Sequence, residues 1–154
     1  MTDTLREPVD FELGDMVGYL IRVSQQVHYS LWQSGDVDGL TSPQFAVLHV
    51  LAHEEPLDQT ALGERASLDR TTVANIVTRL TRRGFVTRER DRVDARRNLV
   101  MLTDAGRAAH GVARRGGHEI NEELLLSTTM KDREELVRIL SKLIANHRDD
   151  IQLG

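Results

Sequence analysis

The chain has 154 residues, of which 40% are hydrophobic, 29% charged and 4% aromatic, and its formal net charge is −4. These values are typical of one globular domain whose core is built from aliphatic helices rather than from a β-sandwich. The absence of cysteine excludes disulfides, thiolate zinc sites and thiol-based redox sensing. The absence of a long apolar run and of a secretion signal leads us to expect a cytoplasmic protein with no membrane partner.

The first part of the chain predicts two helices separated by a break. Apolar residues recur at mostly helical spacing over 9–33, which predicts one long N-terminal helix. The segment SGDVDG at 34–39 is rich in turn-forming residues. Ser42 is predicted to be an N-cap with Pro43 in the first helical position, and this second helix should end before Pro56.

The next segment predicts a helix-turn-helix. Asp58 is suited to cap a short helix, Ser67 and Leu68 form the turn, and Asp69 is suited to cap the helix that follows. Gly84 should end that helix as its C′ residue. Its apolar residues repeat at the spacing i, i+3, i+4 and i+7, namely Val73, Ile76, Val77 and Leu80. Two short helices joined by a tight turn have this pattern.

A β-hairpin and two further helices complete the predicted elements. Strands at 85–88 and 98–102 flank the polar loop RDRVDARR, and such a hairpin directly after a helix-turn-helix is a wing. Thr103 and Asp104 should cap a long helix that reaches about residue 126, and a last helix should cover about 132–147.

The predicted fold class is therefore mainly α with a small β-hairpin wing. We expect a single domain over 1–154, with a winged helix-turn-helix at 40–103 and helical dimerisation regions at 9–35 and 104–147. Neither amphipathic flanking region can bury its apolar stripe on so small a winged module, which favours packing against a second copy. The alternative is that both regions fold back on their own chain.

Charge is distributed unevenly along this chain. Residues 63–115 contain 13 arginines against 6 acidic residues, a net of +7, whereas the remaining residues carry −11. Such segregation is typical of a nucleic-acid-binding module on an acidic scaffold. A basic run can also be an ordinary solvated face, so the charge alone does not decide the function.

The helix after Asp69 carries side chains suited to the major groove. Because its apolar stripe must face the core, its polar side is exposed, and residues near its N-terminus would enter the groove. Asn75 can make a bidentate contact to adenine, and Arg79 can reach guanine or a phosphate. The predicted DNA-contact residues on this helix are Arg70, Thr71, Thr72, Asn75, Thr78 and Arg79, whereas Arg82 and Arg83 are assigned to phosphate or to the surface. The alternative is a solvated helix that contacts no base.

The hairpin tip adds Arg90, Arg92, Arg96 and Arg97 as predicted DNA contacts. A two-stranded ribbon can extend an arginine into a narrow minor groove, where negative potential is concentrated. Asp94 is also assigned to the site, because an acid at a DNA-facing tip makes sense if it pairs with an arginine and fixes its guanidinium. The alternative is a surface ion pair of little energetic worth.

The sequence resembles the MarR family of winged-helix transcriptional regulators over roughly residues 40–110. The matching segments are LTSPQFAVLHVL (40–51), LGERASLDRTTVANIVTRLTRRGFV (62–86) and DRVDARRNLVMLTDAG (91–106). The most specific element is the D-x-R of Asp94 and Arg96, followed by Leu-Thr at 102–103. The resemblance implies an obligate homodimer with intertwined terminal helices on a pseudo-palindromic operator. It also implies that Arg96 enters the minor groove, with Asp94 orienting it.

The same resemblance implies control by a small molecule. Family members often release DNA when a phenolic or aromatic carboxylate compound, or its thioester, binds between the dimer helices and the winged head. Aromatic side chains could stack on such a ring, and an arginine or histidine could pair with its carboxylate. The candidate ligand residues are Tyr19, Arg22, His28, Trp32, Phe45 and His49. The alternative is that these aromatics belong to the dimer core.

Three other functions are less well supported by the sequence. A metal-responsive regulator is suggested by His49 and His53 at i, i+4 spacing, with Glu54, His110 and His118 elsewhere, but without a thiolate we assign no metal and no cofactor. An enzyme is not expected, because no nucleophile elbow, phosphate-binding glycine loop or HExxH motif occurs. A winged helix used for protein interaction would not need the basic wing. The favoured function is a ligand-responsive, sequence-specific DNA-binding regulator, with repression favoured over activation.

Overall fold

The computed structural model describes residues 12–94 and 96–147 and is mainly helical. After a short 3-10 helix at Leu13–Asp15, the helices are α1 (Val17–Ser34), α2 (Ser42–Glu54), α3 (Gln59–Ala66), α4 (Arg70–Arg82), α5 (Asp104–Leu124) and α6 (Met130–Asn146). The strands are β1 (Leu57–Asp58), β2 (Val86–Arg90) and β3 (Asn98–Leu102). The predicted fold class, mainly α with a small hairpin wing, is confirmed.

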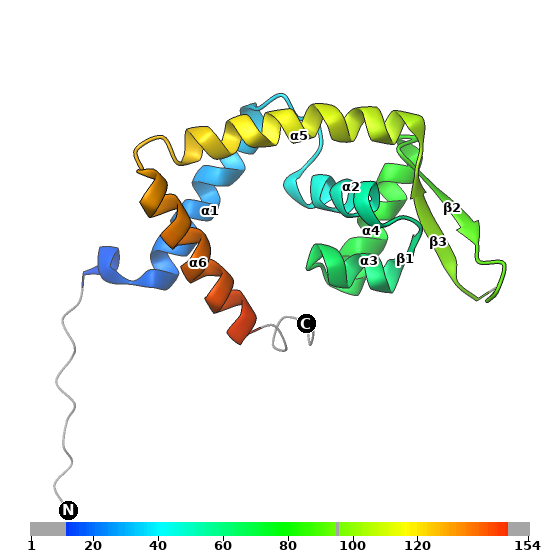
Figure 1. The fold of residues 1–154 in the computed structure, drawn as a ribbon, viewed down its shortest axis with the longest axis horizontal. Coiled ribbons are helices and arrows are strands. Elements are labelled where there is room, and N and C mark those ends of the chain that lie inside the picture. Colours follow the sequence, from blue (N-terminus) through cyan, green and yellow to red (C-terminus); the bar gives the residue numbers. More distant parts are fainter. Residues whose placement is uncertain (1–11, 95, 148–154) are drawn as a thin grey trace, which may run out of the picture.

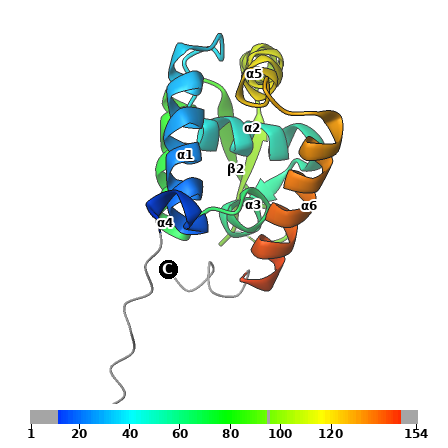
Figure 2. The same cartoon turned by 90° about the vertical axis from the view of Figure 1, so that its left-hand side faces the viewer.

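The helices and strands separate into a head and an arm. Helices α2, α3 and α4 and the three strands form the head, from which the β2–β3 hairpin projects as the wing (Figure 1). Helix α5 extends from the base of the wing towards the opposite end of the molecule, where α1 and α6 lie (Figure 1). Seen from that end, α1 and α6 descend on opposite sides below α5 (Figure 2). No helix within the described residues has the length and apolarity that crossing a membrane requires.

The first two helices begin at positions that differ from those predicted. Helix α1 starts at Val17, because Met16 before it is extended, with φ −83° and ψ 113°, and residues 9–11 of the predicted helix lie outside the described residues. Helix α2 is capped by Thr41 rather than by Ser42. The Thr41 side chain accepts from the Gln44 amide at 3.3 Å, and the Gln44 side chain accepts from the Thr41 amide at 3.0 Å. This reciprocal capping box satisfies two backbone donors at once, which Ser42 does not do here.

The helix-turn-helix forms as its capping residues predict. Asp58 accepts a hydrogen bond from the Ala61 amide at 2.9 Å, and Asp69 accepts one from the Thr72 amide at 2.8 Å. Ser67 adopts the left-handed conformation between α3 and α4, with φ 54°. Gly84, with φ 75°, follows the C-cap of α4 and lets the chain turn into β2.

The sheet has a third strand that the sequence did not predict. The two residues of β1 pair with β3, so the strand order is β1–β3–β2 with antiparallel neighbours. Strand β2 also extends beyond the predicted end at residue 88 and reaches Arg90, which pairs with Asn98. A two-residue strand directly after Pro56 has no alternation that a periodicity argument could detect.

The core lies in the head and along the inner face of α5. The predicted stripe on α4 is confirmed, since Val73, Ile76, Val77 and Leu80 are all buried. Helix α5 runs unbroken through Gly116, which is buried beside the α1–α2 loop. A Cβ at Gly116 would lie 2.0 Å from the Asp36 carbonyl oxygen, so the helix and the loop can approach this closely only at a glycine.

Candidate nucleic-acid interface

The outer face of α4 presents polar side chains to solvent. Arg70, Thr71, Asn75 and Arg79 are exposed. Within the described residues, none of these four side chains forms an ion pair, and none is engaged in a side-chain hydrogen bond. Because the buried stripe fixes the rotation of the helix, these groups point away from the core together. They remain able to donate to bases or phosphates.

Two threonines that were predicted to contact DNA use their hydroxyl groups inside the head instead. The Thr72 hydroxyl donates to the Asp69 carboxylate, which also caps the helix. The Thr78 hydroxyl donates to the Ala74 carbonyl oxygen at 2.9 Å and accepts from Arg88 Nη2, also at 2.9 Å. The bonds from Thr72 to Asp69 and from Thr78 to Ala74 are common for threonine near a helix cap or within a helix. Thr72 and Thr78 therefore stabilise α4 through their hydroxyl groups, and their assignment as DNA contacts stays a prediction.

Arg88 on β2 was missed as a member of this surface. Its contact with Thr78 ties the wing strand to α4, and no spacing in the sequence indicates that these two residues meet. Arg83 also has a role that the sequence did not reveal. Its guanidinium donates to the Asp38 and Gly39 carbonyl oxygens at 2.7 and 3.2 Å and lies 4.5 Å from the centre of the Phe85 ring.

The wing turn is shaped by the acids within it. Asp91 accepts from the Val93 amide at 2.8 Å, and Asp94 accepts from the Arg96 amide at 3.0 Å. The Asp94 carbonyl oxygen also accepts from the Arg97 amide at 2.9 Å. Asp94 was predicted to hold the Arg96 guanidinium, but in the described structure it holds the Arg96 backbone. The acid still orients Arg96, because it fixes the turn from which that exposed side chain leaves.

Arg97 is paired with an acid of the head. Its guanidinium donates through Nε to Asp58 Oδ2 at 3.0 Å, and its Nη2 forms an ion pair with the same oxygen. The structure therefore gives Arg97 a partner within the head, and its assignment as a DNA contact stays a prediction. Arg90, Arg92 and Arg96 of the wing are exposed and form no ion pair within the described residues.

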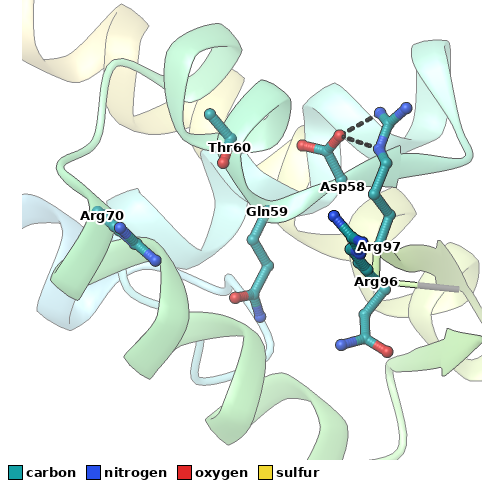
Figure 3. Close-up of a pocket in the computed structure, with 7 residues that line it drawn as sticks. Asp58, Gln59, Thr60, Arg70, Arg96 and Arg97 are labelled. Carbon is teal, nitrogen blue, oxygen red and sulfur yellow. Dashed lines mark hydrogen bonds and ion pairs between the residues drawn. The ribbon is translucent and has the colours of Figure 1, made fainter. Parts of the chain in front are cut away.

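An open cleft separates the wing from α3 and α4 (Figure 3). Its volume is about 480 Å³, and its lining is polar and basic, formed by Asp58, Gln59, Thr60, Arg70, Arg96, Arg97 and Asn98. In the close-up, Arg70 lies on the side of α4 and Arg96 on the side of the wing, with the Asp58–Arg97 pair along one edge. Arg70 and Arg96, which form no ion pair with any residue that the structure describes, thus face one concave surface, which favours an anionic occupant.

The two acids that cap α3 and α4 remain charged beside these arginines. The hydrogen bond from the Ala61 amide is the largest cause that lowers the pKa of Asp58, and the hydrogen bond from Arg97 is the next. For Asp69, the Thr72 hydroxyl and then the Thr72 amide lower the pKa. Both carboxylates are therefore ionised near neutral pH, and each is occupied by partners within the head.

The predicted ligand residues divide into two groups. His28, Trp32, Phe45 and His49 form a continuous string, with successive ring centres 5.7, 5.6 and 5.5 Å apart. Trp32 is buried, and its Nε1 donates to the Leu40 carbonyl oxygen at 2.6 Å. Tyr19 and Arg22 stand apart from this string on α1, where the guanidinium carbon lies 5.2 Å from the Tyr19 ring centre.

His110 of α5 joins this string although the sequence did not place it there. It stacks on Phe45 at 5.7 Å, and its Nε2 lies 3.1 Å from His49 Nδ1. Burial, followed by a neighbouring histidine, lowers the pKa of His49 and of His110, so both rings are neutral at pH 7. Although His53 is also close, at 4.6 Å from His49 between ring centres, the described residues contain no group of three or more potential ligands arranged to hold a metal ion.

Comparison with known proteins places this architecture in a family. A family model described as MarR family matches residues 38–97, the segment from just before α2 to Arg97 in the wing. The transcriptional repressor NicR of Pseudomonas putida is 30% identical over 135 residues, which cover 87% of this chain and 85% of NicR. The chain belongs to the MarR family.

Two solved MarR-like structures extend the match beyond the head. The PcaV regulator of Streptomyces coelicolor, solved with its natural ligand, has a TM-score of 0.84 and 36% identity, and the match covers 90% of this chain and 98% of PcaV. BpsR of Bordetella bronchiseptica, whose DNA binding is regulated by 6-hydroxynicotinic acid, has a TM-score of 0.82 and 27% identity, with 87% and 96% covered. The resemblance therefore includes the arm as well as the head.

This MarR-family protein is a transcriptional regulator and not an enzyme. The D-x-R element that carried the sequence resemblance lies in its wing, and the Leu-Thr element ends β3 and caps α5 through Thr103. The family pattern therefore marks the two ends of the strand that supports the wing tip.

Proposed function

We propose that this MarR-family regulator is a repressor that binds a pseudo-palindromic operator as a homodimer and releases it when a small aromatic acid binds. The observation that carries the DNA-binding part is the open cleft with Arg70 of α4 on one side and Arg96 of the wing on the other, neither of which forms an ion pair within the described residues (Figure 3). Repression is favoured because the related NicR is a repressor. A module used only for protein contacts would not need this basic surface.

The exposed side chains of α4 and of the wing are suited to different grooves of the duplex. Arg70, Thr71, Asn75 and Arg79 are presented on one helix face, as an element that enters the major groove requires. Arg96 projects from the wing turn and is suited to the minor groove. The wing also carries Arg90 and Arg92, which are suited to phosphates.

The direct test is titration of a labelled duplex from the gene's own upstream region, with a shuffled duplex of equal length as control. Equal affinity for both duplexes would contradict sequence-specific binding.

Two apolar helix faces support the homodimer. Within one chain α6 buries none of its residues, and large apolar side chains are exposed on α6 and α1. The most accessible members are Met130 at 68%, Tyr29 and Val137 at 64%, and Val17 at 62%. Apolar surface of this extent is typical of a protein interface. Both helices lie at the end of the molecule opposite the wing (Figure 1), which favours a second copy of this chain as the partner that covers them.

Leu140→Asp should convert the dimer into monomers, because the carboxylate would be placed on the apolar face of α6. Sedimentation velocity should show the wild type as a dimer and the variant with a dimer dissociation constant raised by at least about tenfold. Ser141→Asp, one residue further along the same helix, is the matched control and should leave the dimer intact. A monomeric wild type would contradict the proposed assembly.

The aromatic string and Arg22 support an aromatic carboxylate as effector. Trp32, Phe45 and His28 offer ring faces, whereas Arg22, nearer the start of α1 beside Tyr19, offers a cation. This combination suits a planar ring that carries a carboxylate. BpsR responds to 6-hydroxynicotinic acid, which is a compound of this class.

We expect 6-hydroxynicotinic acid and hydroxybenzoic acids to raise the melting temperature and to weaken operator binding, since an effector that binds the free regulator better shifts the equilibrium away from DNA. Coenzyme A thioesters of the same acids are the second probe set. Arg22→Gln should lower the affinity for the carboxylate by roughly tenfold or more, because a charged hydrogen bond is lost. Operator binding by Arg22→Gln should be unchanged. Arg138→Gln on α6 is the control, and equal responses of both variants would exclude Arg22 from the site.

A further inference from the structure

The linker between α2 and α3 holds strand β3 at both of its ends. At one end, Glu55 accepts from the Leu102 amide at 2.7 Å and forms an ion pair with Arg107 of α5. At the other end, Asp58 forms its ion pair with Arg97. Glu55 and Asp58, which are three residues apart, therefore fix the two ends of β3. Glu55 holds the end next to α5, and Asp58 holds the end next to the wing turn.

Asp58 combines three structural roles at one position. It caps α3 by accepting from the Ala61 amide at 2.9 Å, and its backbone pairs with Leu99 of β3 within the sheet. Its Oδ2 also receives Arg97 (Figure 3). The start of α3 and the start of β3 are consequently joined through one residue, whose side chain is only 19% exposed.

The wing has little other support on this side. Strand β1 covers only Leu99 and Val100 of β3, and the turn beyond Asn98 is bonded mainly to itself through Asp91 and Asp94. On the opposite strand, Arg88 contacts Thr78 of α4. Among the described residues of β3 and the wing turn, Arg97 forms the side-chain ion pair that reaches the helix-turn-helix.

We propose that Asp58 and Arg97 form a latch that sets the position of the wing relative to α3 and α4, so that both act as positioning residues for operator binding without contacting DNA. This inference rests on the proposed duplex binding. The cleft beside the pair has Arg70 on its helical side and Arg96 on its wing side. Loosening the latch would therefore change the separation between the groups that must engage adjacent grooves.

The latch and a purely electrostatic model predict opposite changes in DNA affinity for the substitution Asp58→Ser. Asp58→Ser removes a negative charge beside the DNA-facing cleft, so an electrostatic model predicts tighter DNA binding. The latch predicts weaker binding, because serine is too short to reach Arg97. Serine is also a good N-cap, which keeps the start of α3 intact. The double variant Asp58→Ser with Arg97→Ala leaves the net charge unchanged, so any loss of affinity cannot come from charge alone.

The test is anisotropy titration of the full-length protein on its own upstream duplex over a range of salt concentrations. We expect Asp58→Ser, Arg97→Ala and the double variant each to lose about tenfold in affinity, with the double variant no worse than either single variant. The slope of log affinity against log salt concentration should match the wild type, because no phosphate contact is lost. Arg65→Ala is the matched control, since it removes an arginine from a similar ion pair with Glu54 away from the wing.

Tighter binding by Asp58→Ser, or wild-type affinity in the double variant, would overturn the latch. A shallower salt slope for Arg97→Ala would also overturn it, since that residue would then contact a phosphate. Circular dichroism checks that each variant is folded, and Arg97→Gln, which leaves the α3 cap untouched, replaces Asp58→Ser if α3 is lost. A wild type that binds no duplex would instead refute the proposed function, so the two failures are distinguishable.

Discussion

Replacing Gly106 with alanine is expected to lower the free energy of unfolding by about 2–4 kcal/mol, the range for severe overpacking. A Cβ at this position would lie 1.9 Å from the Phe85 carbonyl oxygen and 2.9 Å from its carbonyl carbon. Both atoms belong to the backbone, so no side-chain rotation relieves the clash. The same carbonyl oxygen accepts from the Thr103 amide at 3.0 Å. Moving α5 away would break this hydrogen bond at the base of the wing.

Gly111→Ala provides the matched control in the same helix. A Cβ at Gly111 meets nothing within 4 Å, so alanine should raise stability by up to about 1 kcal/mol through its higher helix propensity. Chemical denaturation at one fixed protein concentration measures both variants, because the stability of an oligomer depends on concentration. Equal effects at the two positions would show that α5 does not approach Phe85 as closely as the structure indicates.

Much of the fold could be predicted because its determinants are local. Asp58 and Asp69 cap helices through amides three residues away, and Gly84 supplies a positive φ where α4 ends. The stripe on α4 repeats with helical periodicity and is buried as that periodicity requires. Each of these signals lies within one turn or one helix, so it is visible in the sequence.

The parts that were missed depend on contacts between distant segments. Strand β1 exists because Leu57 and Asp58 meet β3 some 40 residues later, at Val100 and Leu99. The cap of α2 is a local exception, since Thr41 caps that helix through a reciprocal bond with Gln44, three residues further on. Gly116 has a low helix propensity, and its role within α5 is set by the Asp36 carbonyl oxygen, which comes too close for any Cβ.

In the candidate site, too, local features could be predicted from the sequence, whereas contacts between distant residues could not. The sequence identified the residue types and the exposed face, and Arg70, Asn75 and Arg79 lie where it placed them. It did not reveal that Arg97 is paired with Asp58, because the partners are 39 residues apart. The contact between His110 and His49 spans 61 residues and was missed for the same reason. Residue type indicates what a side chain can bind, but only the fold shows whether another residue has already engaged it.

Arg96→Ala is expected to reduce operator affinity on the order of a hundredfold, because a dimer would lose one groove contact from each of its two wings. The side chain is exposed and unpaired within the described residues. Its backbone is held by Asp94 at 3.0 Å, so the turn should persist in the variant. Dimer formation and melting temperature should therefore equal those of the wild type.

The salt dependence of this variant separates its contribution from that of the latch. Arg96→Ala should give a shallower slope of log affinity against log salt concentration, because fewer counterions are released when each head binds. Arg96→Lys keeps the charge but loses the planar guanidinium, so its slope should stay close to the wild type while its affinity falls. Wild-type affinity for Arg96→Ala would exclude the wing tip from the interface. In that case the D-x-R element would have to be explained by its role in the turn alone.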